Sequence, residues 1–125
     1  MVESSEPRKR ILLVDDEQKI LKFLEVKLRL SGYEVITATS GRQALELVKS
    51  AKPDIMLLDV IMPEMDGFDV LQKLRTFTQL PVIVFSARAG NSDKAMSLGA
   101  NDYIAKPFNL DELVTRVKAL VDHTR

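Results

Sequence analysis

Hydrophobic and polar positions divide the chain into two kinds of segment that alternate along its length. Five segments are short apolar runs, at Ile11–Val14, Val35–Ile36, Ile55–Leu58, Val82–Phe85 and Tyr103–Ala105. Apolar runs without polar alternation are typical of strands buried on both faces of a parallel sheet. The intervening segments have apolar residues three or four positions apart, which is helical spacing. In the last of them these residues are Leu110, Leu113, Val114, Val117, Leu120 and Val121.

Individual polar and glycine residues predict where the helices begin and end. Ser40 and Asn109 are residue types that cap helix N-termini, and each is followed three positions later by Gln or Glu. Gly32 and Gly99 lie where a helix is expected to end in a left-handed residue.

The order strand then helix, repeated five times, predicts an open, doubly wound α/β sheet. Short connections between such units require parallel strands with right-handed crossovers, so helices cover both faces of the sheet. A chain of 125 residues suits one domain, since domains typically hold about 150 residues. We expect a flexible N-terminal tail over 1–9, a single domain over 10–122 and a short exit over 123–125.

Composition and charge narrow the class of protein. Apolar residues make up 46% and charged residues 29%, as in ordinary globular domains. The 18 basic and 18 acidic residues give no basic surplus, so we expect no direct contact with nucleic acid. The absence of cysteine excludes disulfide scaffolds, zinc–thiolate sites and thiol nucleophiles. No apolar run reaches the ~18 residues of a membrane span, and the start lacks the order of a signal peptide. We therefore expect a cytoplasmic location and no membrane contact.

Polar residues follow four of the five apolar runs directly. They are Asp15, Asp16 and Glu17 after the first run, Asp59 after the third, Ser86 after the fourth and Lys106 after the fifth. Each has a purely structural interpretation: Asp16 as a helix cap, Asp59 as a turn former, Ser86 as a loop hydroxyl and Lys106 as a surface charge. Together, however, they are expected at one edge of the sheet, because the carboxyl ends of parallel strands lie side by side. This is also the edge at which such sheets bind their ligands.

This set of residues predicts a magnesium-assisted phosphoryl transfer to an aspartate. Three crowded carboxylates repel one another and need a cation to remain ionised. Without cysteine, and with the only histidine at position 123, the ligands must be oxygen atoms, which Mg²⁺ prefers. A carboxylate near Mg²⁺ can attack phosphorus and form an acyl phosphate. Lys106 would neutralise charge on the phosphoryl oxygens, and Ser86 could donate a hydrogen bond to one of them.

At this point the motifs resemble a known family. They are Ile11–Glu17, Pro53–Gly67, Pro81–Ala87 and Gly99–Phe108. In this order and spacing they are similar to the receiver domain of bacterial two-component response regulators, over essentially the whole chain. The resemblance implies a flavodoxin-like (βα)5 fold with a five-stranded parallel sheet in the order 2-1-3-4-5. It also implies a signalling switch that catalyses only its own Mg²⁺-dependent phosphorylation and dephosphorylation.

The resemblance assigns a role to each site residue. Asp59 would be the phosphoacceptor, loaded by a sensor histidine kinase. Asp16, Asp59 and the main-chain carbonyl of Ile61 would hold Mg²⁺ directly, and Asp15 would hold it through water. The other implied phosphoryl contacts are the side chains of Lys106 and Ser86 and the main-chain N–H groups of Val60 and Ala87. The family also implies a cis peptide bond at Lys106–Pro107.

The resemblance further implies a switch and a dimer. Phosphorylation adds roughly −1.5 to −2 charge, which would draw Ser86 toward the phosphoryl group and let Tyr103 turn inward. This would change the surface formed by the fourth helix, fifth strand and fifth helix. The closest resemblance within the family is to OmpR/PhoB-like regulators, which dimerise through that face. The candidate dimer residues are Lys94, Asp102, Glu112 and Arg116, although a merely solvated charged face explains them equally well.

Other functions were weighed on the same residues. A haloacid-dehalogenase-type hydrolase needs an acid two positions after its nucleophile, where this chain has Ile61. A flavodoxin-type flavin carrier needs a hydroxyl- and glycine-rich phosphate loop after the first strand, where this chain has three acids. A degenerate receiver that acts only as a binding module is disfavoured by the complete set of site residues. The sequence leaves open whether the regulator stands alone or continues into an effector domain.

Overall fold

The computed structural model describes residues 8–62, 65–86 and 91–121. Its strands are β1 (Arg10–Val14), β2 (Glu34–Ala38), β3 (Ile55–Asp59), β4 (Val82–Ser86) and β5 (Asp102–Ala105). Its helices are α1 (Gln18–Leu30), α2 (Gly41–Ala51), α3 (Gly67–Leu74), α4 (Ser92–Ser97) and α5 (Leu110–Val121). The predicted alternation of strand and helix is confirmed.

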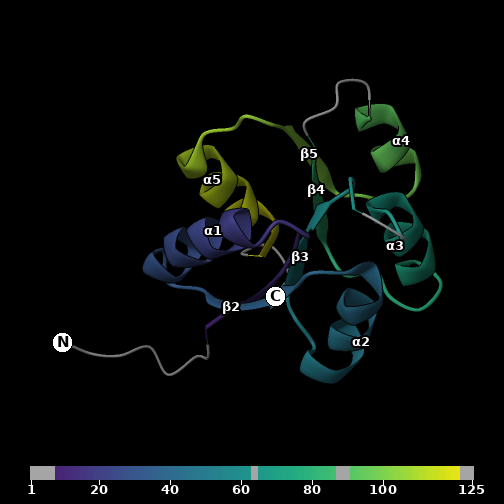
Figure 1. Cartoon of the computed structure of the whole chain (residues 1–125), viewed down its shortest axis with the longest axis horizontal. Helices are drawn as coiled ribbons and strands as arrows, with labels where there is room; N and C mark the ends of the chain where they lie inside the picture. Colours follow the sequence, from purple (N-terminus) through teal and green to yellow (C-terminus); the bar gives the residue numbers. More distant parts are fainter. Residues whose placement is uncertain (1–7, 63–64, 87–90, 122–125) are drawn as a thin grey trace.

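The five strands form one parallel sheet in the order β2-β1-β3-β4-β5. Figure 1 views this sheet nearly edge-on, with α1 and α5 on one face and α2, α3 and α4 on the other. The predicted doubly wound fold is therefore confirmed. Because all strands point the same way, the residues at their carboxyl ends lie along one edge.

Successive strand residues face opposite sides of the sheet and divide the core into two clusters. Ile11 and Leu13 pack with α1 and α5, whereas Leu12 and Val14 pack with α2 and α3. All four are fully buried, which explains why the strands show no polar alternation in the sequence.

The predicted helix ends are confirmed in four places. The Ser40 hydroxyl accepts a hydrogen bond from Gln43 N–H at 3.2 Å, and Asn109 Oδ1 accepts from Asp111 N–H at 2.7 Å. Gly32, with φ +101°, follows the end of α1, and Gly99, with φ +105°, follows the end of α4; both have the left-handed conformation that glycine adopts at little cost. In α2, the side-chain oxygen of Gln43 accepts a hydrogen bond from the N–H of Thr39 rather than from that of the cap residue Ser40.

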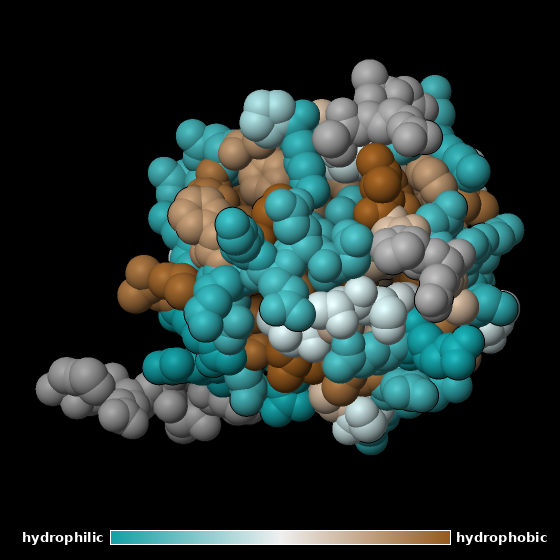
Figure 2. Space-filling model, in the orientation of Figure 1, coloured by the Kyte–Doolittle hydropathy of each residue, from teal (hydrophilic) through white to brown (hydrophobic). Residues whose placement is uncertain are grey.

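Two surface findings complete the fold. Within the described residues, none of the helices has the length and apolar character needed to cross a bilayer. Figure 2 shows a mostly hydrophilic face on which apolar side chains are exposed in small groups.

Lys9, at the predicted end of the tail, already accepts a main-chain hydrogen bond from Glu34 at 3.0 Å. Residues 1–7 and 122–125, which hold the rest of the predicted tail and exit, lie outside the described residues.

Candidate phosphoryl and metal site

Three aspartates meet at the carboxyl edge of the sheet, as the sequence predicts. Asp15 follows β1 and Asp59 ends β3; both are buried, whereas Asp16 is exposed. One carboxylate oxygen from each lies within 4.8 Å of the others. The alternative interpretation of Asp16 as a helix cap is wrong, because the N-cap position of α1 is occupied by Glu17.

Local backbone hydrogen bonds fix the two buried carboxylates. Asp15 Oδ1 accepts from the N–H of Glu17 at 3.0 Å, and Asp59 Oδ1 accepts from the N–H of Ile61 at 3.1 Å. Each bond spans two residues, the geometry of an Asx turn. The turns leave Oδ2 of both residues directed toward the shared space between the strands, where Lys106 reaches them.

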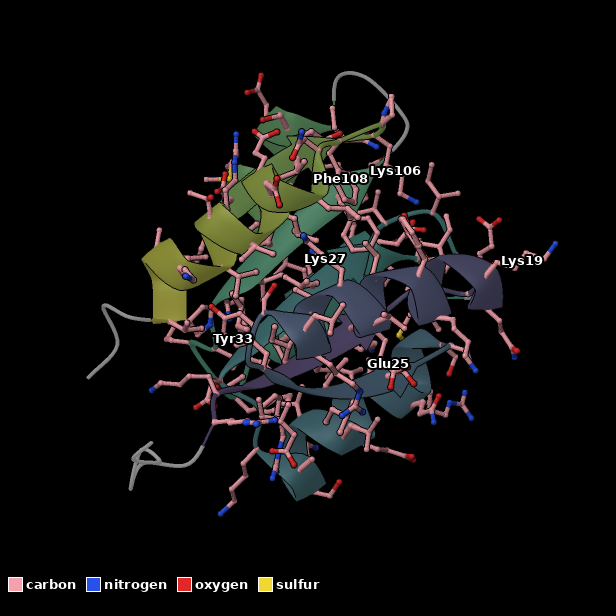
Figure 3. The ribbon with its side chains drawn as sticks, turned by 90° about the vertical axis from the view of Figure 1, so that its left-hand side faces the viewer. Lys19, Glu25, Lys27, Tyr33, Lys106 and Phe108 are labelled. Carbon is pink, nitrogen blue, oxygen red and sulfur yellow. The ribbon has the colours of Figure 1, made fainter. Side chains whose placement is uncertain are left out.

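Lys106 supplies one positive charge to this pair. Its Nζ lies 3.6 Å from Asp15 Oδ2 and 3.6 Å from Asp59 Oδ2. The ammonium also lies over the Phe85 ring, 5.0 Å from its centroid, and Phe85 meets Phe108 edge to face. Figure 3 shows Lys106 and Phe108 at the same end of the molecule. These aromatic contacts limit where the lysine side chain can lie.

The two buried carboxyl groups resist ionisation. The pKa of Asp15 is raised to about 6, mainly by burial and in part by the neighbouring Asp59 charge. Burial likewise raises the pKa of Asp59. The hydrogen bond to each carboxylate and the Lys106 charge act in the opposite direction without cancelling the effect. One ammonium therefore does not compensate two buried carboxylates.

The donor set fits a hard divalent cation. Asp15 Oδ2 is buried and has no hydrogen-bond partner among the described residues. A buried polar atom without such a partner is costly unless a cation or water satisfies it. The three clustered side chains offer only oxygen ligands, and two of them are buried carboxylates with raised pKa values. Mg²⁺ in phosphoryl-transfer sites is bound by oxygen ligands of this kind. The Ile61 carbonyl, expected as a further ligand, belongs to an exposed residue directly after this cluster.

Close packing holds the loop after Asp59. Gly67 N–H donates to the Val60 carbonyl at 3.0 Å. A Cβ atom on Gly67 would lie 2.5 Å from Val60 Cα and 2.6 Å from the Asp59 carbonyl oxygen, which is closer than real contacts allow. Only glycine therefore lets α3 begin so close to the residues that carry the site.

The two predicted switch residues lie on the α4 side of the sheet. Ser86 is fully buried, and its hydroxyl accepts a hydrogen bond from Asn91 Nδ2 at 3.3 Å. Tyr103 is half-buried against the cluster beneath α3 and α4, and it pairs with Val84, two residues before Ser86. Ser86 and Tyr103 therefore share one face of neighbouring strands.

Three further predictions from the sequence concern single backbone groups. Val60 is buried directly after Asp59. The Lys106–Pro107 peptide bond is cis. Ala87 falls outside the described residues.

Sequence reasoning missed Asn91, which contacts a predicted switch residue. Its position just before a short helix would have suggested a cap and nothing more.

The candidate dimer residues form contacts within the single chain. Arg116 Nη1 lies 2.8 Å from Asp102 Oδ1, and Arg116 Nη2 lies 2.7 Å from Glu112 Oε2. The same Nη1 donates to the Tyr103 carbonyl at 3.1 Å. Lys94 lies over the ring of Phe68, 4.4 Å from its centroid. Exchange of these ion pairs across a dimer axis stays a prediction.

Comparison with known proteins gives a consistent family. Residues 11–118 match the family model of the response regulator receiver domain. The transcriptional regulatory protein KdpE of Mycobacterium tuberculosis is 46% identical over 113 residues, which are 89% of this chain and 50% of that protein. The response regulator MprA of Mycolicibacterium vanbaalenii is 44% identical over 118 residues, covering 92% of this chain and 51% of that protein. The chain thus spans about half the length of these relatives.

Solved structures agree. The receiver domain of the Francisella response regulator 1452 superimposes with a TM-score of 0.89 at 34% identity, covering 94% of this chain and 99% of that one. The response regulator TrrA of Thermotoga maritima, solved in complex with Mg²⁺ and BeF, gives a TM-score of 0.83 at 37% identity, covering 90% and 98%. With the fold, the acidic cluster and these matches in agreement, the chain belongs to the receiver-domain family of two-component response regulators.

Proposed function

We propose that this chain accepts a phosphoryl group on Asp59 from a sensor histidine kinase and that Mg²⁺ is its cofactor. The observation that carries the proposal is the position of Asp59 between the other site residues. It ends β3, which lies between β1, directly followed by Asp15, and β4, which ends at Ser86. Lys106 Nζ lies 3.6 Å from Asp59 Oδ2. A phosphoryl group on Asp59 would therefore lie between the carboxylates that follow β1 on one side and two donors, the Ser86 hydroxyl and the Lys106 ammonium, on the other.

The proposed reaction is an in-line transfer between two protein side chains. A carboxylate oxygen of Asp59 attacks the phosphorus of a phosphohistidine, a new O–P bond forms and the P–N bond breaks. The electron pair of that bond stays on the imidazole nitrogen of the kinase. Lys106 and the N–H groups of Val60 and Ala87 would stabilise the negative charge on the phosphoryl oxygens.

Asp16, Asp59 and the Ile61 carbonyl would hold Mg²⁺ directly, and Asp15 would hold it through water. When bound, the ion would neutralise charge on the carboxylates and on the phosphoryl oxygens. The buried Oδ2 of Asp15, which has an ion pair with Lys106 but no hydrogen bond among the described residues, supports this assignment.

Phosphorylation would act as a switch through Ser86 and Tyr103. The new charge would attract the Ser86 hydroxyl, and Tyr103 on the same face would repack. The surface of α4, β5 and α5 would then change, favouring a homodimer or a downstream partner. Lys94, Asp102, Glu112 and Arg116 are the residues proposed for that dimer face.

The remaining proposals concern the protein as a whole. We infer a cytoplasmic switch that catalyses only its own phosphorylation and dephosphorylation, with no direct nucleic-acid contact by this domain. Relatives about twice as long, among them KdpE, which is named as a transcriptional regulatory protein, support an effector domain or a separate downstream protein as the output.

The test is intact mass after incubation with acetyl phosphate and Mg²⁺. We expect the wild-type chain to gain one phosphoryl group. Asp59→Asn and wild type with EDTA should gain none, and the matched control Asp69→Asn, which changes an exposed carboxylate on α3, should behave as wild type. A mass gain in Asp59→Asn equal to that of wild type would refute the assignment.

A further inference from the structure

Asn91 uses its side chain in a way that its position does not predict. It occupies the N-cap position of α4, and asparagine is favoured there because its side-chain oxygen accepts from the helix's first N–H groups. Asn91 makes no such bond, and its backbone is helical, with φ −84° and ψ −6°, instead of extended. Its Nδ2 donates to the Ser86 hydroxyl at 3.3 Å.

The surroundings leave this side chain room to change partners. Asn91 lines a cavity of about 320 Å³ together with Val60, Ile61 and Lys94. Val60 and Ile61 directly follow Asp59 in the chain, so part of the cavity wall comes from the segment that carries the phosphoacceptor. Asn91 thus lines this cavity, contacts Ser86 at the end of β4 and directly precedes the first turn of α4.

Two uses of this one side chain compete. A cap requires an extended backbone at Asn91, with the side chain turned to the N–H groups of Asp93 or Lys94. The observed bond requires the side chain to face Ser86, which is fully buried. A movement of the Ser86 hydroxyl toward Asp59 would lengthen the bond to Asn91 and free the side chain for the helix.

We propose that Asn91 is a positioning residue that holds the Ser86 hydroxyl in the unphosphorylated protein and caps α4 once that hydroxyl turns to a phosphoryl group on Asp59. This inference rests on the proposed function. Phosphorylation at Asp59 would affect α4 because the hydrogen bond between Asn91 and Ser86 is exchanged for one between Asn91 and the first N–H groups of the helix. The start of α4 is then stabilised only in the phosphorylated state.

The test uses two substitutions that separate the two bonds, with beryllofluoride and Mg²⁺ as the phosphoryl mimic. Asn91→Ser keeps a capping side chain that is too short to reach Ser86, so it should bind beryllofluoride about fivefold more tightly than wild type, the equivalent of one neutral hydrogen bond. Asn91→Ala loses both bonds and should bind as wild type does. Ser92→Ala, on the exposed neighbouring residue, is the matched control and should also bind as wild type. Far-UV circular dichroism verifies that each variant is folded.

Amide hydrogen exchange in α4 distinguishes this role from a purely structural one, because a purely structural Asn91 would not make the protection of these amides depend on beryllofluoride. Beryllofluoride should increase protection of the Asp93 and Lys94 N–H groups in wild type and in Asn91→Ser, but not in Asn91→Ala. Without beryllofluoride, these two amides should exchange equally fast in wild type and in Asn91→Ala, because the cap is absent from both.

The possible results distinguish the role of Asn91 from the phosphoacceptor function of Asp59. Equal or weaker beryllofluoride binding by Asn91→Ser than by wild type overturns the role of Asn91 and leaves the phosphoacceptor function intact. Weaker binding would instead make Asn91 a direct phosphoryl ligand. Failure of wild type to bind beryllofluoride at all overturns the phosphoacceptor function, and the role of Asn91 with it.

Discussion

Replacing Asp15 by Asn should stabilise the metal-free protein, and the gain should depend on pH. Burial raises the pKa of Asp15 from 3.8 to about 6, so the folded state keeps a proton that the unfolded chain has already released. Between these two values the unfolded state binds fewer protons, and stability falls as pH rises. The fully ionised side chain then costs about 3 kcal/mol, at about 1.4 kcal/mol per pH unit. Asparagine has the same shape, can still accept from Glu17 N–H and carries no charge.

The assay is urea unfolding of wild type and Asp15→Asn in EDTA, from pH 4 to pH 8. The variant should gain about 2–3 kcal/mol of unfolding free energy at pH 8 and almost nothing at pH 4. The matched control Asp69→Asn, on an exposed position, should stay within about 0.5 kcal/mol of wild type throughout. A variant that is less stable than wild type at pH 8, or a gain of equal size at both ends, would refute the account of these carboxylates.

Four further results are expected. Mg²⁺ at 100 times its Kd should stabilise wild type by about 2.7 kcal/mol in thermal unfolding, and should stabilise Asp59→Asn by much less. Lys106→Gln should slow phosphoryl uptake from acetyl phosphate about 100-fold in initial rates measured by mass, since it removes one charge from the developing oxygens. Gly67→Ala should cost about 1–3 kcal/mol in urea unfolding, because its Cβ meets the backbone that carries the site. Ser40→Ala should cost about 1 kcal/mol in the same assay through the lost cap of α2.

The sequence predicts the fold well because burial leaves a direct record in residue type. Leu12 and Leu13 face opposite clusters, yet both had to be apolar, and this continuous pattern is what distinguishes a sheet covered on both sides. The strand ends were predicted less closely. The sequence interpretation placed Asp59 and Ser86 after their strands, whereas each is the last residue of its strand. A polar residue at a buried strand end does not resemble the rest of the strand.

The site was predictable in membership but not in its contacts. Parallel strands deliver Asp15, Asp59 and Lys106 to one edge whatever their rotamers, so their meeting follows from topology. The bond between Asn91 and Ser86 depends instead on the path of a loop and the turn of one side chain. Arg116 likewise pairs with two carboxylates of its own chain, an arrangement that the charge pattern alone does not determine.

Among the three clustered aspartates, we propose that Asp59 carries the phosphoryl group. The most direct measurement is borohydride reduction of the acetyl-phosphate-treated protein followed by peptide mass mapping, since an acyl phosphate is reduced to homoserine and a free carboxylate is not. We expect homoserine at position 59 alone, and none when Mg²⁺ is removed. Homoserine at position 15 or 16, or its absence from a protein that gained a phosphoryl group, would contradict it.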